Sequence, residues 1–139
     1  MFRRILVAVD GSEGSRRAVR EAVILAREME TPLHILAVED HLPRFAATIA
    51  ETKEAVEELD HFYQGVLGQA SAIAAEQLVT ATSEIRRGNA AEMIVQRARE
   101  LDVDLVIVGR NPHLPLRERL IGTTSHRVAD LAPCDVLIA

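Results

Sequence analysis

The residues best suited to chemistry lie near the C-terminus, where two glycine-containing segments flank a basic, proline-containing loop. The first segment is Val108-Gly109-Arg110-Asn111-Pro112, and nine residues separate it from the second, Gly122-Thr123-Thr124-Ser125. Glycine lets a backbone approach an anion closely, and a helix start offers free N–H groups and the positive end of a dipole. The pattern predicts a phosphate-binding loop between a strand and a helix.

The phosphate candidates in these two segments share small or hydroxyl-bearing side chains, and they are Gly109, Gly122, Thr123, Thr124 and Ser125. Backbone N–H groups and hydroxyls of this kind bind phosphate oxygens. Arg110, Arg117 and Arg119 could add bidentate contacts. The alternative is a strand-end glycine, an ordinary helix cap and arginines in a solvated loop.

Composition limits the classes of function. The chain has 139 residues, and 48% of them are hydrophobic, whereas 3% are aromatic and none is Trp. These values predict one α/β domain spanning residues 1–139 with an aliphatic core. The formal net charge of −5 argues against non-specific nucleic-acid binding, which needs a basic face.

The single cysteine and the scattered histidines argue against metal chemistry. Cys134 alone excludes an intramolecular disulfide and a cysteine-based metal cluster, and we expect it to be a buried, inert thiol. No pair among the five histidines has metal-ligand spacing. The apolar run after the basic start is too short for a signal peptide, and no stretch reaches the ~20 residues of a membrane span. We expect a cytoplasmic protein without a membrane segment.

Apolar runs and helical periodicity alternate along the chain. Strands are expected at Ile5–Val9, Leu33–Val38, Val79–Arg87, Leu105–Val108 and Val136–Ala139. Helices are expected after the cap Ser12 or Ser15, within 43–78, after the cap Asn89, and over Thr123–Leu131. The apolar face of the segment 43–78 would carry Ala55, Leu59, Phe62, Val66, Ala70 and Ile73. The pattern leaves open whether 43–78 forms one helix or two.

Strict alternation of strand and helix predicts a parallel sheet with helices on both faces. In such open sheets, ligands bind beyond the C-terminal ends of the strands. Asp10, Val38 and Gly109 each lie at the end of an expected strand. The fold would therefore bring these three residues to one crevice.

Several segments resemble the universal stress protein family. Ile5-Leu6-Val7-Ala8-Val9-Asp10-Gly11-Ser12 is similar to the family's first strand and Asp-Gly-Ser step, and Gly88, Asp102–Gly109 and Ala132–Ile138 match its later signatures in order. The C-terminal loop resembles the family's G-x-x-G-x9-G-(S/T) nucleotide loop. The resemblance implies a flavodoxin-like sheet of order 3-2-1-4-5 and usually a homodimer. It also implies a choice, because some members bind ATP and others do not.

The resemblance assigns roles to three positions. It places Asp10 near the base or ribose of ATP and the backbone of Val38 against adenine, although Asp10 could simply cap a turn. Pro112 departs from the pattern because it replaces one of the three loop glycines. Proline has no N–H group and adds bulk, so it would remove a phosphate contact.

We therefore weigh three functions. The first is a regulatory module that binds ATP or a related adenine nucleotide, with Mg²⁺, and whose loop presents a surface to a protein partner. The second is a member that binds no ATP because of Pro112 and works through protein contacts. The third is a slow ATPase, for which Asp10 and Asp40 are the only candidate acids. The sequence nominates no catalytic base, so we expect no enzyme.

The last expected strand would form an open edge of the sheet. Val136, Leu137 and Ile138 are apolar, and exposed apolar edges are normally paired or covered. The family resemblance implies that this strand pairs across a twofold axis in a homodimer. The alternative is an edge covered by the protein's own helix.

Overall fold

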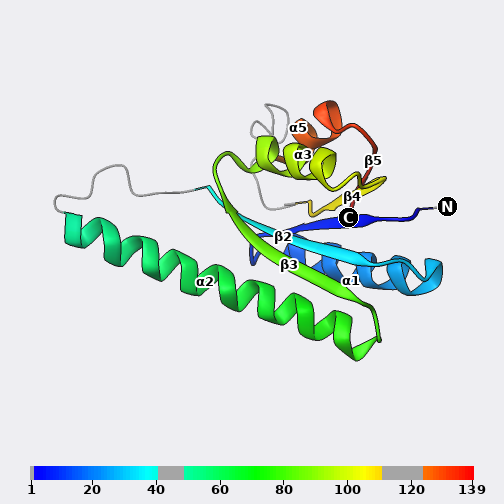
Figure 1. The fold of residues 1–139 in the computed structure, drawn as a ribbon, viewed down its shortest axis with the longest axis horizontal. Coiled ribbons are helices and arrows are strands. Elements are labelled where there is room, and N and C mark those ends of the chain that lie inside the picture. Colours follow the sequence, from blue (N-terminus) through cyan, green and yellow to red (C-terminus); the bar gives the residue numbers. More distant parts are fainter. Residues whose placement is uncertain (1, 41–48, 111–123) are drawn as a thin grey trace.

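The computed structural model describes residues 2–40, 49–110 and 124–139, and within them a parallel sheet lies between two layers of helices (Figure 1). The elements follow in the order β1 (Ile5–Val9), α1 (Glu13–Met29), β2 (Leu33–Glu39), α2 (Ile49–Glu76), β3 (Ala81–Arg87), α3 (Ala90–Glu100), β4 (Leu105–Val108), α5 (Thr124–Leu131) and β5 (Asp135–Ile138). Strand and helix alternate as the sequence predicts.

The five strands are all parallel and lie in the order β3-β2-β1-β4-β5. This confirms the order 3-2-1-4-5 that the family resemblance implied. Central β1 aligns Ile5 with Leu33 of β2 on one side and with Leu105 of β4 on the other. A strand covered on both faces needs apolar side chains at successive positions, which explains the continuous apolar run of β1.

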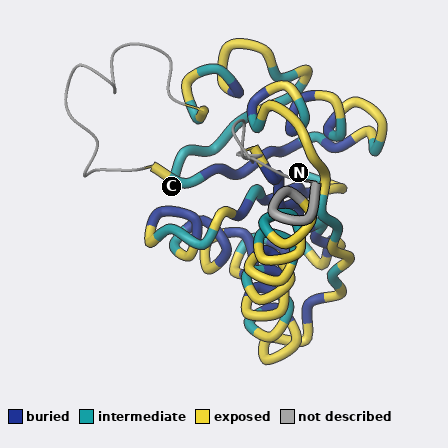
Figure 2. The backbone as a smooth tube through the Cα atoms, turned by 90° about the vertical axis from the view of Figure 1, so that its left-hand side faces the viewer, coloured by how far each residue is buried: buried dark blue, intermediate teal, exposed yellow. Residues whose placement is uncertain are grey.

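Two apolar layers separate the sheet from its helices. Ile5, Val7 and Val9 of β1 pack with α1 and α2 on one face, whereas Leu6 packs with α3 and α5 on the other. Figure 2 shows these buried segments in the interior and the exposed residues along the outer sides of the helices. Aliphatic side chains fill both layers, in keeping with the low aromatic content.

Polar caps begin two of the helices where the sequence predicts. The side chain of Ser12 accepts a hydrogen bond from the backbone N–H of Ser15 at the start of α1. The side chain of Asn89 accepts one from the backbone N–H of Glu92 at the start of α3. Each cap satisfies a backbone donor that has no partner within its own helix.

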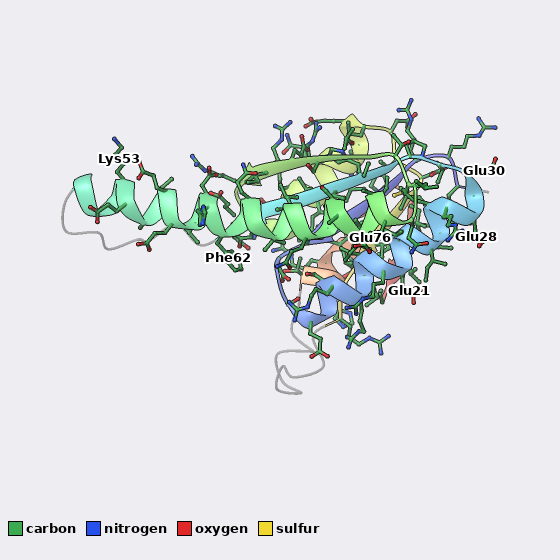
Figure 3. All side chains as sticks on the ribbon, turned by 90° about the horizontal axis from the view of Figure 1, so that it is seen from below. Glu21, Glu28, Glu30, Lys53, Phe62 and Glu76 are labelled. Carbon is green, nitrogen blue, oxygen red and sulfur yellow. The ribbon has the colours of Figure 1, made fainter. Side chains whose placement is uncertain are left out.

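The described part of segment 43–78 contains one long helix, α2, whose N-terminal end projects beyond the sheet (Figure 1). The predicted apolar face is wrong at Phe62, whose side chain is 52% exposed, whereas Tyr63 is 7% exposed. Figure 3 shows Phe62 partway along α2 and Lys53 near the projecting end. The buried stripe runs instead through Tyr63, Leu67, Ala70 and Ala74, steps of four, three and four that keep one side of the helix on the sheet.

The remaining differences from the sequence prediction are small shifts at strand ends. β2 continues one residue past Val38 to Glu39, β3 begins at Ala81 rather than Val79, and β5 runs from Asp135 to Ile138. β3 pairs only with β2 among the described strands and consists of half-buried and exposed residues, as expected of an edge strand. Within the described residues, no helix is both long and apolar enough to cross a membrane.

Replacing Leu78 with glycine should stabilise the protein. Leu78 follows α2 with a φ of +59°, and its side chain is 93% exposed. Glycine adopts this left-handed conformation without steric cost, so we expect a gain of about 0.5 kcal/mol in the free energy of unfolding. Chemical denaturation measures it, with Thr80→Gly as the control that should lose stability. A loss in Leu78→Gly would contradict the account.

Candidate functional site

A cavity of about 600 Å³ lies beyond the C-terminal ends of the strands. Its lining comes from four strand ends and three helix starts, and it comprises Ala8, Val9, Asp10, Ser12, Ser15, Leu36, Val38, Ala90, Ile94, Val108, Gly109, Arg110, Thr124, Ser125, His126 and Ile138. This is the place where open parallel sheets bind ligands. Asp10, Val38 and Gly109 meet there as the sequence predicted.

Three helices begin at this cavity. Its lining includes Ser12, the N-cap of α1, together with the first residues of α3 and α5, Ala90 and Thr124. The start of each helix carries backbone N–H groups and a partial positive charge from the aligned peptide dipoles. Three such starts around one cavity favour an anionic ligand.

A rigid turn holds Asp10 at the cavity. Its Oδ1 accepts a hydrogen bond of 2.8 Å from the backbone N–H of Ser12, and its own backbone N–H donates to Oγ of Ser15 at 3.3 Å. The hydroxyl of Ser15 in turn donates to the carbonyl of Ser12 at 3.1 Å. Asp10 therefore caps its turn and also lines the cavity, so the two interpretations of this residue are compatible.

The floor of the site depends on two glycines that touch each other. A β-carbon at Gly109 would lie 2.6 Å from the backbone nitrogen of Ser15 and would overlap the carbonyl group of Gly14. A β-carbon at Gly14 would overlap the carbonyl oxygen of Arg110. The end of β4 thus packs directly on the first turn of α1, a contact that only glycine permits on both sides.

Gly14 was missed by the sequence analysis, because a glycine inside a helical turn is not by itself a signal of close packing. Its place two residues after the Asp10-Gly11-Ser12 turn was the clue available. His126 and Ile138 were also missed as lining residues. His126 follows the predicted site residue Ser125, and Ile138 follows the predicted interface residue Leu137. Only the observed positions of α5 and β5 show that these two side chains line the cavity.

The C-terminal loop residues divide into two groups. Gly109, Arg110, Thr124 and Ser125 line the cavity. Pro112, Gly122 and Thr123, together with Arg117 and Arg119, lie outside the described residues. The structure therefore describes only the two ends of the predicted phosphate loop, which are the end of β4 and the start of α5.

The strand proposed for dimerisation also borders the cavity. Ile138 lines it, and Val136 and Ile138 pack against the core under α3 and α5, whereas Leu137 packs against the opposite core. All three side chains are half-buried. β5 is the last strand of the sheet, so its outer edge has no neighbouring strand among the described residues.

Asp40, at the end of β2, already has a structural partner, whereas Cys134 lies just before β5 begins, at the other end of the sheet from the cavity. Asp40 accepts a hydrogen bond of 3.2 Å from the backbone N–H of Ala90 and so supports the start of α3. Burial raises the pKa of the half-buried Cys134 thiol, and the nearby charge of Asp135 raises it further. A raised pKa disfavours the nucleophilic thiolate. Among the described residues, no His, Cys, Asp or Glu cluster could hold a metal ion.

Known proteins share this architecture. The sequence model of the Universal stress protein family matches residues 1–139. The chain is 33% identical to the universal stress protein YxiE of Bacillus subtilis, with 99% of each chain covered. A universal stress protein solved in complex with cAMP is 24% identical, with a TM-score of 0.77 and 99% and 96% of the chains covered. A family member from Arabidopsis thaliana with AMP bound is 18% identical, with a TM-score of 0.74 over 98% and 90% of the chains.

The contact between Gly14 and Gly109 predicts a sharp steric response. We expect Gly109→Ala to lower the free energy of unfolding by about 1–3 kcal/mol, because the backbone of Gly14 and Ser15 must move. The matched control is Gly68→Ala in α2, where nothing lies within 4 Å of the new β-carbon. Alanine favours the helix there, so stability should rise by up to about 1 kcal/mol. Equal responses of the two variants to urea would refute the close contact.

Proposed function

The chain belongs to the universal stress protein family, and on that premise we propose that it binds an adenine nucleotide in the cavity at the strand ends and acts as a nucleotide-dependent regulatory module. The observation that carries the proposal is the convergence of three helix starts on a cavity that also has apolar walls. Solved relatives that hold AMP or cAMP support the choice of an adenine nucleotide.

The lining suggests how a nucleotide would lie. Leu36, Val38, Ala90 and Ile94 offer apolar surface for a base, and Asp10 offers a carboxylate that can accept hydrogen bonds from hydroxyl groups. Gly109, Thr124 and Ser125 lie where backbone and hydroxyl donors would receive phosphate oxygens. These two groups of residues would read the two ends of one nucleotide.

The number of phosphate groups on the bound nucleotide is a separate part of the proposal. ATP with Mg²⁺ is our first ligand, and Pro112 is the reason to test AMP beside it, because proline offers no N–H group to a phosphate. A member that binds no nucleotide and works through protein contacts is the alternative. In the regulatory proposal, nucleotide binding acts through the segment 110–121 on a surface that a partner protein contacts.

A slow ATPase remains a minor alternative. Its two candidate acids, Asp10 and Asp40, each accept a hydrogen bond from a backbone N–H group, that of Ser12 and that of Ala90 respectively. Such bonds fix the carboxylates as supports of a turn and a helix start. They favour a binding role over general-base catalysis.

A charge at the start of α5 tests the nucleotide proposal. Thr124 is exposed and lines the cavity, so Thr124→Glu places a carboxylate where phosphate would bind, while an acidic first turn favours the helix. We expect nucleotide-free wild type to bind Mg-ATP or AMP with micromolar Kd in calorimetry, and Thr124→Glu to weaken this at least ~10-fold.

Two controls make this test specific. Ala129→Glu adds the same charge at an exposed position of α5 outside the cavity lining, and it should leave affinity unchanged. Pro112→Gly restores the family's third glycine and should increase the affinity for ATP more than that for AMP. If wild type and Pro112→Gly both fail to bind any adenine nucleotide, the proposed function is wrong.

We also propose a homodimer formed through the outer edge of β5. Its apolar side chains and its place at the end of the sheet support this, because open apolar edges are normally paired or covered. Light scattering on the purified protein should give twice the 15.3 kDa mass of one chain. A mass of one chain at micromolar concentration would favour an edge covered by the protein's own helix.

A further inference from the structure

The last residue of β2 is a buried carboxylic acid on the opposite face from the cavity. The side chain of Glu39 is 0% exposed, and its Oε2 accepts a hydrogen bond of 3.0 Å from Nε of Arg87. Its other oxygen, Oε1, is buried and has no hydrogen-bond donor among the described residues. A buried oxygen without a donor costs stability, so this group calls for a physical explanation.

A second acid approaches Glu39 from α2. Arg87 is the register partner of Glu39 in β3, and its Nη2 lies 3.8 Å from Oδ1 of Asp60. One guanidinium therefore faces two carboxyl groups. Because ionised carboxylates only accept hydrogen bonds, Asp60 can satisfy Oε1 of Glu39 only if one of the two acids carries a proton.

The surroundings favour that proton. Burial raises the pKa of Glu39 above its ordinary value near 4.5, the side chain of Asp60 raises it further, and Arg87 opposes both without cancelling them. The other titratable groups nearby are Tyr63 on α2, whose pKa is raised first by burial, and Asp10 and Asp40 at the neighbouring strand ends. Negative groups thus outnumber the one arginine.

We propose that Glu39 and Asp60 share one proton, and that this proton holds α2 against the C-terminal edge of the sheet. α2 also contacts the turn beside the cavity, since a β-carbon at Gly11 would lie 2.9 Å from Cζ of Phe62 and 3.1 Å from Cγ2 of Val66. Loss of the proton sets the buried carboxylate of Glu39 against the half-exposed carboxylate of Asp60 at the point where α2 meets the sheet. The pair is a proton-binding site that acts independently of any nucleotide.

The Glu39→Gln variant separates this proposal from a simple ion pair. Glutamine keeps an acceptor for Arg87 and supplies the donor that Asp60 needs at every pH. In the wild type, the raised pKa makes the stabilisation complete below about 4.5, and it is lost as pH rises through the folded-state pKa. The Tm of the variant should therefore match the wild type near pH 4 and exceed it by ~3 °C at pH 8.

The ion-pair interpretation predicts the opposite sign, because glutamine would lose the charge that pairs with Arg87. A Tm below the wild type at pH 8 would overturn the proposal. Glu84 is the matched control. Burial alone raises its pKa, but the hydrogen bonds from Arg97 and the proximity of His34 together outweigh burial and lower it. Glu84→Gln should therefore lower the Tm at pH 8.

Tyr63 gives a second, local readout. It is the only tyrosine, the chain has no tryptophan, and Tyr63 lies within the electrostatic reach of Glu39. We expect its fluorescence in the wild type to titrate with a midpoint above the ordinary glutamate pKa and below that of tyrosine. Glu39→Gln should abolish this transition. Absence of the transition in the wild type would overturn the proposal even if the variants failed to fold.

Discussion

The end of β4 and the first turn of α1 lie so close that neither backbone leaves room for a β-carbon. The contact between Gly109 and Gly14 sets the height of α1 above the sheet. With α1 at this height, the turn that carries Asp10 and the N-cap Ser12 border the same cavity as the end of β4. The start of α5 completes the wall across from them. A single steric constraint therefore organises residues from both halves of the chain.

At the end of β2, successive side chains point to opposite faces of the sheet and so enter two different environments. Val38 faces the cavity, and the next residue, Glu39, faces the opposite layer beneath α2. The following Asp40 supports the start of α3. Three successive residues thus serve the ligand cavity, the attachment of α2 and the attachment of α3. A change at any of them is expected to affect the other two through the backbone.

Local patterns predicted much of this arrangement. Apolar runs located the strands, Ser12 and Asn89 located helix starts, and the family resemblance supplied the strand order. Contacts between distant segments could not be read in the same way. The helical period placed Phe62 in the core, but the sheet determines which side of α2 is buried, and it selects Tyr63. The roles of Gly14 and of buried Glu39 likewise depend on residues that are distant in sequence. Gly14 packs against Gly109 and Arg110, and Glu39 pairs with Arg87 of β3.

The central claim is that an adenine nucleotide occupies the cavity where three helices begin. Amide chemical shifts of the ¹⁵N-labelled protein, followed during titration with AMP and with Mg-ATP, test it most directly because each residue reports separately. The account predicts the largest shifts at Val38, Gly109, Thr124 and Ser125, with little change at the far ends of β3 and α2. An unchanged spectrum, or shifts confined to residues outside the cavity, would contradict it.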